Sequence, residues 1–344
     1  MQGGLREQVS LAPLTTFAVP ARARLFAQLS SQADVEALIA DGSVSTAPRL
    51  LLGGGSNILL VGDFDGLVLR NGVAGIESIE GAGEVTVVAG GGIQWDALVD
   101  HCVQQGWGGV ENLSLIPGTV GAAPIQNIGA YGAELADVFL FLDAIDLDSG
   151  QLRRFSREEC RFTYRTSVFR RPDHANRYCV LRVALRLSLR PRLEISYPSL
   201  AAELKGVAVT GLGLAEVRAA VIRVRTRRLP APSRQGNAGS FFKNPQLSSQ
   251  QVAELRQDHP TLPAFPGEGA SLRIPAGWLI QRAGCGGATH GGAAVSPQHS
   301  LVLVNTGNAT GQDVVALART IRAQVVERFG VVLEPEVTII GAEL

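Results

Sequence analysis

The chain has 344 residues and no net charge at pH 7, with 46% hydrophobic and 18% charged residues. This length exceeds what one hydrophobic core usually supports, so we expect two or three domains. The balanced charge argues against bulk electrostatic binding to nucleic acid or an acidic membrane, and the lack of a membrane-length apolar stretch or a signal-peptide core predicts a cytoplasmic protein.

Strand and helix patterns alternate in the first part of the chain. The sequence predicts a strand over residues 23–29, a helix over residues 33–40, and a second strand that runs from Arg49 into the glycines beginning at Gly53. This order is typical of a small α/β unit.

Strand signals dominate the next region. A strand predicted over residues 85–89 leads into a glycine-rich turn, and the segment 181–189 alternates so regularly that we expect one buried and one solvated face. Between these strands the sequence predicts an amphipathic helix, whose apolar face consists of Trp95, Leu98, Val99, Cys102 and Val103.

Three helices are predicted in the last part of the chain. A proline-containing stretch at residues 229–232 breaks one helix and predicts a hinge. A second helix is predicted to begin at Ser248, and a third over residues 312–329, which starts with a capping-box-like pair and stops at Gly330.

Three glycine-rich segments have neither a helical nor a strand period: residues 53–57, 116–132 and 236–245. Their exposable N–H groups could line a phosphate or a flat ring. Neither usual nucleotide fingerprint is complete, because Ile58 stands where G-x-G-x-x-G needs its last glycine and no Gly-Lys-Ser/Thr follows. A cofactor would therefore need another nucleotide-binding fold.

In the third segment, Ser240 follows two glycines and precedes two phenylalanines. Glycines allow sharp turns and a close approach of a ligand to the main chain. An ordinary turn before the helix at Ser248 and a ligand-facing loop that presents Ser240 are both open interpretations from the local chemistry alone.

Six segments in this order resemble UDP-N-acetylenolpyruvoylglucosamine reductases, the flavin enzymes that make UDP-N-acetylmuramate for bacterial peptidoglycan. The resemblance covers nearly the whole chain, and the segments are residues 15–17, 53–57, 116–132, 164–167, 236–245 and 333–337.

The resemblance implies an α+β and α/β architecture. Two subdomains would form the FAD-binding fold of the vanillyl-alcohol-oxidase (PCMH) type, and a C-terminal α+β domain would bind the substrate. The first FAD-binding subdomain is expected at residues 1–70, joined by a C-terminal strand at 331–344, and the second at residues 71–228. The substrate-binding domain is expected at residues 229–330. This fold holds FAD without a Rossmann unit, which agrees with the incomplete fingerprints.

The resemblance also implies the FAD-binding residues. They are Gly53, Gly54, Gly55, Ser56, Asn57, Pro117, Gly118, Gly121, Ala122, Gln126, Asn127, Gly129, Ala130 and Tyr131.

The implied chemistry is hydride transfer from NADPH through FAD to an enolpyruvyl ether, with Ser240 as the proton donor. Arg165 and Glu336 match the residues that meet the substrate carboxylate. A guanidinium fork stabilises charge growing on that carboxylate, whereas a second carboxylate would repel it, so we expect Glu336 to carry or share a proton. Arg165 could instead form a surface ion pair, and Glu336 could lie in a solvated turn before a last strand at 337–340.

The residues matched to substrate binding are Tyr197, Arg228, Lys243, Asn244 and His299. Tyr197 matches a tyrosine that the longer subtype of the family places over the nucleotide diphosphate. A tyrosine in the core or at a sheet edge is an equally good interpretation of this residue. Arg228 replaces a lysine and would hold a diphosphate as a fork, whereas His299 replaces a glutamine, which puts the contact to the base in doubt. We expect UDP-N-acetylglucosamine enolpyruvate and NADPH to share one site, in a monomer.

Two other classes of function remain open. A flavin oxidase of alcohols or hydroxy acids on this fold would usually tether its flavin through a histidine, and neither the 53–57 nor the 116–132 segment contains one. A silent nucleotide-binding module would have no use for Ser240, Arg165 and Glu336 together.

The cysteines form no C-x-x-C pair and have no metal-type spacing to the histidines, so we expect reduced, packed thiols and no metal site.

Overall fold

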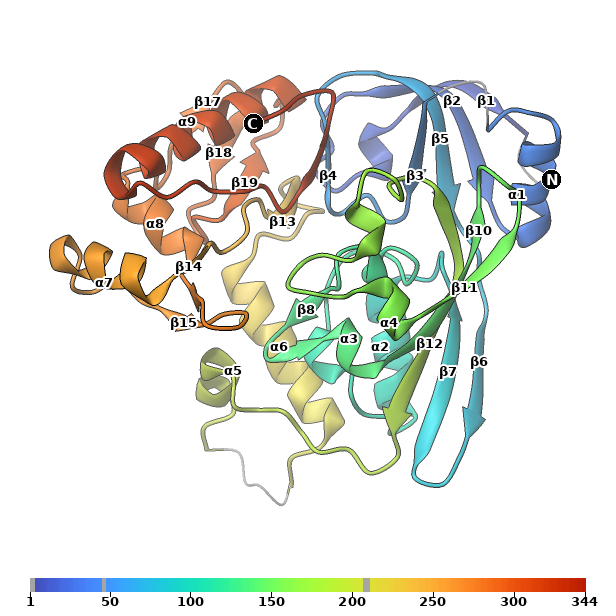
Figure 1. Cartoon of the computed structure of the whole chain (residues 1–344), viewed down its shortest axis with the longest axis horizontal. Helices are drawn as coiled ribbons and strands as arrows, with labels where there is room; N and C mark the ends of the chain where they lie inside the picture. Colours follow the sequence, from blue (N-terminus) through green and yellow to red (C-terminus); the bar gives the residue numbers. More distant parts are fainter. Residues whose placement is uncertain (1–3, 45–47, 207–210) are drawn as a thin grey trace. The chain divides into compact units, whose positions relative to one another are not determined.

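The computed structural model describes residues 4–44, 48–206 and 211–344 (Figure 1). Met1–Gly3, which begin the segment inspected for a signal peptide, lie outside these residues. The chain divides into two compact units. Unit 1 consists of residues 1–9, 23–55 and 65–227, and unit 2 of residues 10–22, 56–64 and 228–344. The finer division into three domains stays a prediction.

Unit 1 contains a sheet in the order β1-β2-β5-β3. Its strands are β1 (Arg6–Ser10), β2 (Arg22–Leu29), β3 (Arg49–Leu52) and β5 (Phe64–Asn71), and β3 runs parallel to β5. Helix α1 (Gln32–Ala40) begins at a capping box between Ser31 and Asp34 and packs Val35 and Leu38 into the core. The predicted strand, helix and strand into Gly53 are confirmed.

A second sheet of unit 1 is antiparallel, in the order β11-β10-β12-β7-β6 (Figure 1). Its strands are β6 (Ile76–Glu80), β7 (Glu84–Gly90), β10 (Phe139–Asp146), β11 (Leu152–Ser156) and β12 (Tyr178–Ser188). The predicted amphipathic helix is α2 (Trp95–Gln104), which buries Trp95, Leu98, Val99 and Cys102 in the core of this sheet.

The alternation predicted for residues 181–189 is confirmed for the most part. One face consists of buried residues, namely Leu181, Val183, Leu185 and Leu187, and the other contains the partly exposed Ser188 and two arginines, with Ala184 as its buried member. Only Arg182 and Arg186 of β12 are exposed. The pairing register shifts between Asp143 and Ala144 of β10, opposite this strand. Such a bulge changes the direction of the side chains, so β12 contributes to two core clusters instead of one.

The rest of unit 1 is made of short elements and one longer helix. They are η2 (Glu111–Leu113), η3 (Ala123–Ile125), β8 (Gly129–Ala130), β9 (Ala133–Glu134), α3 (Leu135–Val138), α4 (Arg157–Cys160), η4 (Val168–Arg170), α5 (Pro198–Glu203) and α6 (Leu214–Arg228), whose last residue belongs to unit 2.

Unit 2 contains a sheet in the order β13-β19-β18-β17, a smaller sheet β14-β16-β15, and a parallel pair of β4 and β20. The strands are β4 (Ile58–Leu60), β13 (Asn237–Ser240), β14 (Gln246–Leu247), β15 (Phe265–Pro266), β16 (Leu272–Arg273), β17 (Thr289–His290), β18 (Ala293–Val295), β19 (Val302–Asn305) and β20 (Thr338–Ile340). The helices are η1 (Ala12–Leu14), α7 (Ser249–Asp258), α8 (Ala276–Arg282) and α9 (Gly311–Phe329).

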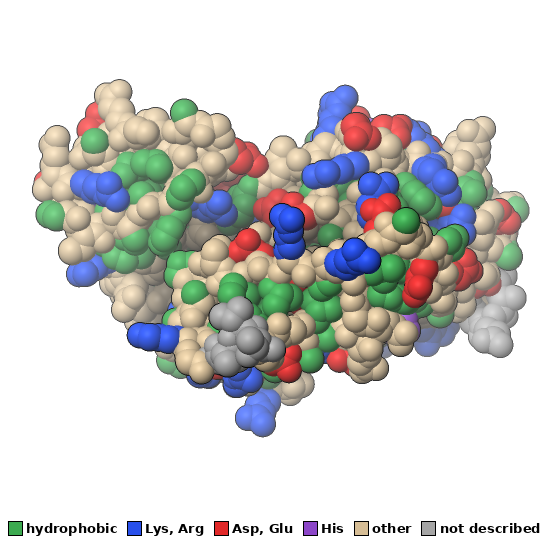
Figure 2. Space-filling model, turned by 90° about the horizontal axis from the view of Figure 1, so that it is seen from below, with side chains coloured by type: hydrophobic (Ala, Val, Ile, Leu, Met, Phe, Trp, Pro, Cys, Tyr) green, Lys and Arg blue, Asp and Glu red, His purple; other side chains and the backbone are tan. Residues whose placement is uncertain are grey.

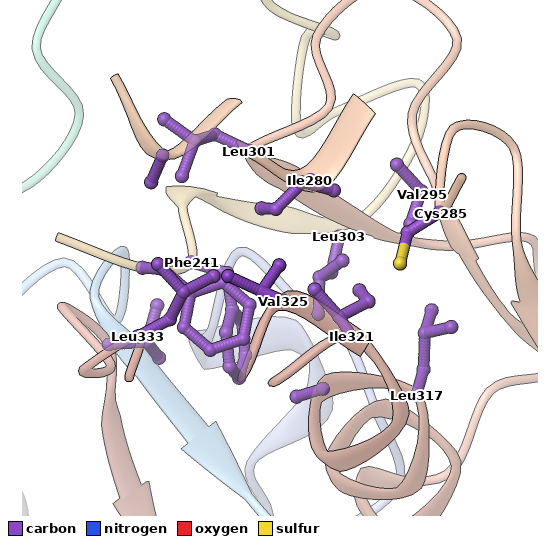
Figure 3. Close-up of a cluster of buried hydrophobic side chains, with 14 of the residues drawn as sticks. Phe241, Ile280, Cys285, Val295, Leu301, Leu303, Leu317, Ile321, Val325 and Leu333 are labelled. Atoms are coloured by element: carbon purple, nitrogen blue, oxygen red, sulfur yellow. The ribbon is translucent and has the colours of Figure 1, made fainter. Parts of the chain in front are cut away.

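Helix α9 supplies one wall of the core of unit 2. A capping box joins its N-cap Thr310 to Asp313, and Gly330 ends it in a left-handed conformation, as predicted. Figure 3 shows Phe241 beside Val325 of this helix and Leu333. The aromatic residues after Ser240 are therefore core residues.

The distribution of surface charges and the burial of the cysteines agree with the composition. On the face drawn in Figure 2, basic and acidic side chains are interspersed, as expected for zero net charge. All four cysteines are buried, and burial raises the pKa of Cys102, Cys160 and Cys179 to about 12. Of the helices in the described ranges, none combines the length and the apolar composition that a membrane span needs.

Candidate active site

Two of the glycine-rich segments meet within unit 1. A Cβ atom on Gly54 would lie 2.8 Å from the Cα of Gly118, and one on Gly53 would lie 2.5 Å from the Oγ1 atom of Thr119. Side chains at these positions would therefore push the two turns apart. The glycines allow the two backbones to approach closely, which brings the predicted cofactor turns together.

The meeting point of these turns fits a flavin nucleotide. The Thr119 hydroxyl is buried there and has no hydrogen-bond partner in the described part of the chain. A buried polar atom without a partner is costly unless a ligand or water satisfies it. Gly55 and Gly118 have φ angles of 62° and 123°, which favour glycine. The other residues predicted to bind FAD that belong to unit 1 stay predictions: Pro117, Gly121, Ala122, Gln126, Gly129, Ala130 and Tyr131.

Asn127 fixes the fold of the 116–132 segment. Its Nδ2 group donates to Glu134 Oε2 at 2.8 Å and to the carbonyl of Thr163 at 3.2 Å, and its Oδ1 accepts from the amide of Ala136 at 3.0 Å. The side chain is buried and its φ is 46°. This amide is therefore engaged within unit 1, and we expect it to support a cofactor through the loop that it shapes.

Arg165 lies at the tip of a two-residue turn. Thr163 and Thr166 exchange backbone hydrogen bonds of 3.2 Å, which leaves Tyr164 and Arg165 at the centre of the turn. Arg165 has a φ of 54°, in the left-handed region. A Cβ atom on Gly129 would come within 3.0 Å of Arg165 Nη1, so the guanidinium lies directly against the 116–132 segment.

A second arginine lies near Arg165 and was missed by the sequence analysis. Arg225 of α6 is hydrogen-bonded to Tyr131. Burial lowers the pKa of its guanidinium, Tyr131 opposes this shift, and the positive charge of Arg165 adds to it. The sequence did contain one signal for it. Arg225 follows the buried Val221 by four residues, so both side chains lie on the same face of the helix.

Tyr197 packs against the same tyrosine. The rings of Tyr131 and Tyr197 are 5.4 Å apart and meet edge to face, at 81°. Tyr197 is 43% exposed and precedes α5, so unit 1 places the tyrosine assigned to the substrate beside one assigned to the cofactor.

Ser240 is the last residue of the strand β13, which pairs with β19 and carries an irregularity between Asn237 and Ser240. The interpretation as a segment without strand structure was wrong, because the pairing partner lies far along the chain. Asn237 is buried and accepts from the amide of Gly239 at 2.9 Å. Ser240 is a partly exposed residue, and the structure shows no hydrogen bond from its hydroxyl to another described residue.

Glu336 lies next to this strand in unit 2. Its amide donates to the carbonyl of Phe241 at 2.8 Å, and its carbonyl accepts from Asn57 Nδ2 at 3.2 Å. The fold therefore places two predicted catalytic residues, Ser240 and Glu336, on adjacent backbone segments. Arg165, the third, belongs to unit 1, and Ser56 belongs with Asn57 to unit 2.

The other predicted substrate residues lie in unit 2. Lys243 is 3.4 Å from the largely exposed carboxylate of Glu334, and Asn244 Oδ1 accepts from the amide of Ala276 at the start of α8. His299 Nδ1 accepts from the amide of Leu301 at 3.2 Å. Burial, and then the charge of Arg228, lower the pKa of His299, so its imidazole is held neutral with Nε2 as a donor.

Metal ligands do not gather in the described ranges: among these residues no three His, Cys, Asp or Glu side chains could hold a metal ion together.

Comparison with known proteins identifies the class to which this fold and site belong. Residues 23–156 match a model described as an FAD binding domain, and residues 231–340 match the C-terminal domain of UDP-N-acetylenolpyruvoylglucosamine reductase. The protein is an oxidoreductase with an FAD-binding fold of the vanillyl-alcohol-oxidase type and a C-terminal α+β domain.

Full-length relatives specify the family. A UDP-N-acetylenolpyruvoylglucosamine reductase from Azoarcus sp. (strain BH72) is 48% identical over 332 residues, which cover 95% of each chain. One from Pseudomonas aeruginosa is 46% identical and covers 96% of this chain and 98% of its own. The crystal structure of such a reductase from Thermus caldophilus has a TM-score of 0.68 at 25% identity and covers 98% of this chain and 99% of that one. The chain belongs to the UDP-N-acetylenolpyruvoylglucosamine reductase family.

Proposed function

We propose that Ser240, Arg165 and Glu336 carry the chemistry of this enzyme. As a member of its family, the protein reduces the enolpyruvyl group of UDP-N-acetylglucosamine enolpyruvate to give UDP-N-acetylmuramate for peptidoglycan synthesis. The chemistry that bound FAD supplies is hydride transfer, from NADPH to the methylene carbon of the enolpyruvyl ether.

The residues of the chain handle the charge that this transfer creates. Negative charge develops on the carbon next to the methylene group and spreads into the substrate carboxylate. The Arg165 guanidinium stabilises that carboxylate as a fork, and Ser240 donates the proton that completes the product. A hydroxyl suffices as the acid because a carbanion is a far stronger base than an alkoxide. Glu336, as a protonated carboxyl, would donate a hydrogen bond to the same carboxylate.

One observation supports these roles most directly. The amide of Glu336 binds the carbonyl of Phe241, the residue after Ser240, at 2.8 Å, so two residues far apart in sequence lie on neighbouring backbone segments. Ser240 is partly exposed and its hydroxyl has no acceptor among the described residues, so it could donate to a ligand.

The test separates the two half-reactions of Ser240→Ala. We expect NADPH to reduce the flavin of this variant at the normal rate, and reoxidation by the enolpyruvyl substrate to be slower by about 10²- to 10⁴-fold, the usual contribution of a general acid. Ser233→Ala is the matched control, because Ser233 is an exposed serine of the same unit. Equal losses in both half-reactions would assign Ser240 to binding or folding instead.

We further propose that NADPH and the UDP-sugar use one site in turn, in a cytoplasmic monomer. Both ligands carry a pyrophosphate, which the same cations, Arg228 and Lys243, would hold. Excess UDP-sugar substrate should then inhibit competitively against NADPH. A stable ternary complex with both ligands bound would exclude a shared site.

A further inference from the structure

The arginines of α6 differ in how their charges are balanced. Arg218 is bound by Asp96 at 2.7 Å and by Asp100 at 3.1 Å. Arg223 and Arg227, both exposed, bind the carboxylate of Glu203. These three guanidiniums are therefore neutralised by carboxylates within unit 1.

Arg225 lies on the same helix but has no such partner. Among the described residues it forms no ion pair, and its Nε atom is buried without a hydrogen-bond acceptor. Asp96 acts on it only from a distance, since that carboxylate is already bound by Arg218 and by the amide of Leu115. A buried donor without an acceptor is costly, and a second positive charge nearby increases this cost.

The surroundings hold Arg225 in place. Tyr131 is hydrogen-bonded to the guanidinium and packs against Tyr197 and the hydrophobic cluster around Val221. Tyr131 itself adopts a left-handed φ of 50° in the turn between β8 and β9. Strained, well-packed residues of this kind typically position a functional group.

We propose that Arg225 is a second carboxylate-binding residue of the Arg165 site, with Tyr131 as its positioning residue. An anion between the two guanidiniums would relieve their repulsion and accept from the buried Nε group. Under the proposed function, on which this inference rests, the anion is the carboxylate of the enolpyruvyl substrate and of its lactyl product. A second fork would stabilise the charge that this carboxylate gains during reduction.

Binding of two related nucleotides tests the assignment. UDP-N-acetylmuramate carries the carboxylate and UDP-N-acetylglucosamine does not, while both carry the pyrophosphate. By titration calorimetry on the FAD-loaded enzyme, we expect Arg225→Gln to weaken UDP-N-acetylmuramate by about 10- to 100-fold, the value of a charge-assisted hydrogen bond. UDP-N-acetylglucosamine should change by less than about twofold, and Arg225→Lys and Tyr131→Phe should lie between wild type and Arg225→Gln.

Matched controls come from the same helix. Arg223→Gln and Arg227→Gln remove exposed guanidiniums that already have a carboxylate partner, and we expect both affinities to stay unchanged. Flavin content and thermal melting show whether each variant is folded.

The possible outcomes are distinct. Equal weakening of both nucleotides by Arg225→Gln would assign Arg225 to the pyrophosphate, and unchanged affinities would make it structural; either result overturns the inference. If the NADPH-reduced wild-type enzyme is not reoxidised by the enolpyruvyl substrate, the proposed function fails, and the inference fails with it.

Discussion

Asn237 links the stability of unit 2 to the position of Ser240. Its buried side chain donates to the carbonyls of Pro230 at 3.1 Å and Gln235 at 2.8 Å, and it accepts from the amide of Gly239 at 2.9 Å. Asn237→Ala removes all of these bonds at once. The start of β13, three residues before the proposed proton donor Ser240, would then lose the contacts that hold it in place.

The expected loss follows from the burial of each partner. Pro230 is buried, so its carbonyl would be left without a donor at a cost of about 1–3 kcal/mol. Gln235 and Gly239 are partly exposed, so water can replace the amide there, and each bond contributes about 0.5–1 kcal/mol. Together, Asn237→Ala should destabilise unit 2 by about 2–5 kcal/mol.

Urea unfolding monitored by Trp278 fluorescence measures this loss, in a background where Trp95 and Trp107 of unit 1 are replaced by Phe. Asn308→Ala, at an exposed asparagine of the same unit, should change stability by less than about 0.5 kcal/mol. Asn237→Asp keeps the acceptor but loses both donors and buries a charge, so it should be at least as damaging as Ala. A cost for Asn237→Ala as small as that of Asn308→Ala would refute the role of this amide.

Further predictions concern the same unit. Gly236→Ala would place a Cβ atom 2.3 Å from a backbone oxygen, so it should destabilise the protein by more than Gly239→Ala. A Cβ atom at Gly239 meets nothing within 4 Å, and this substitution costs only about 1 kcal/mol for the left-handed φ of the residue. Equal melting temperatures of the two variants would contradict this prediction. Because burial and Arg228 lower the pKa of His299, the neutral imidazole stabilises the fold above the pKa of the unfolded state, and this contribution is lost as pH falls from about 6.5 through the lower folded value. Arg228→Gln should raise that pKa in an NMR titration, and an unchanged value would show that the charge does not act on His299. Glu336→Gln should retain much more turnover than Glu336→Asp at neutral pH if a protonated carboxyl is needed, and the reverse order would require an ionised one.

The regular elements could be predicted because their signals are local. Helix α9 contains its start, its buried face and its stop within its own residues: the N-cap Thr310, the apolar repeat and Gly330. The strands β2 and β3 and the helix α1 were likewise found from short-range periodicity. Short-range periodicity also gave most of the alternation in β12 but not its bulge, because the bulge depends on the partner strand β10.

The environment of the proposed site could be predicted only in part. The sequence separates β13 from β19 by some sixty residues, so nothing local showed that Ser240 ends a paired strand or that Phe241 is a core residue. Arg225 was missed because arginines are frequent on α6, and only contacts with other elements show which of them lacks a carboxylate.

Buried asparagines fix irregular backbone in both units. Asn127 shapes the segment beside Arg165, Asn237 shapes the segment before Ser240, and Asn305 donates to the carbonyl of Phe17 at 3.1 Å and accepts from the amides of Gly307 and Ala309 at 2.8 and 3.0 Å. A single amide offers two donors and an acceptor without charge, so it can satisfy backbone groups that no helix or sheet pairs. Aspartate would lose the donors and bury a charge, and serine would reach fewer partners. Segments that present a hydroxyl, a guanidinium or a glycine turn can thus keep a fixed shape where the backbone departs from regular helix or sheet pairing, because these amides hold them from the buried side.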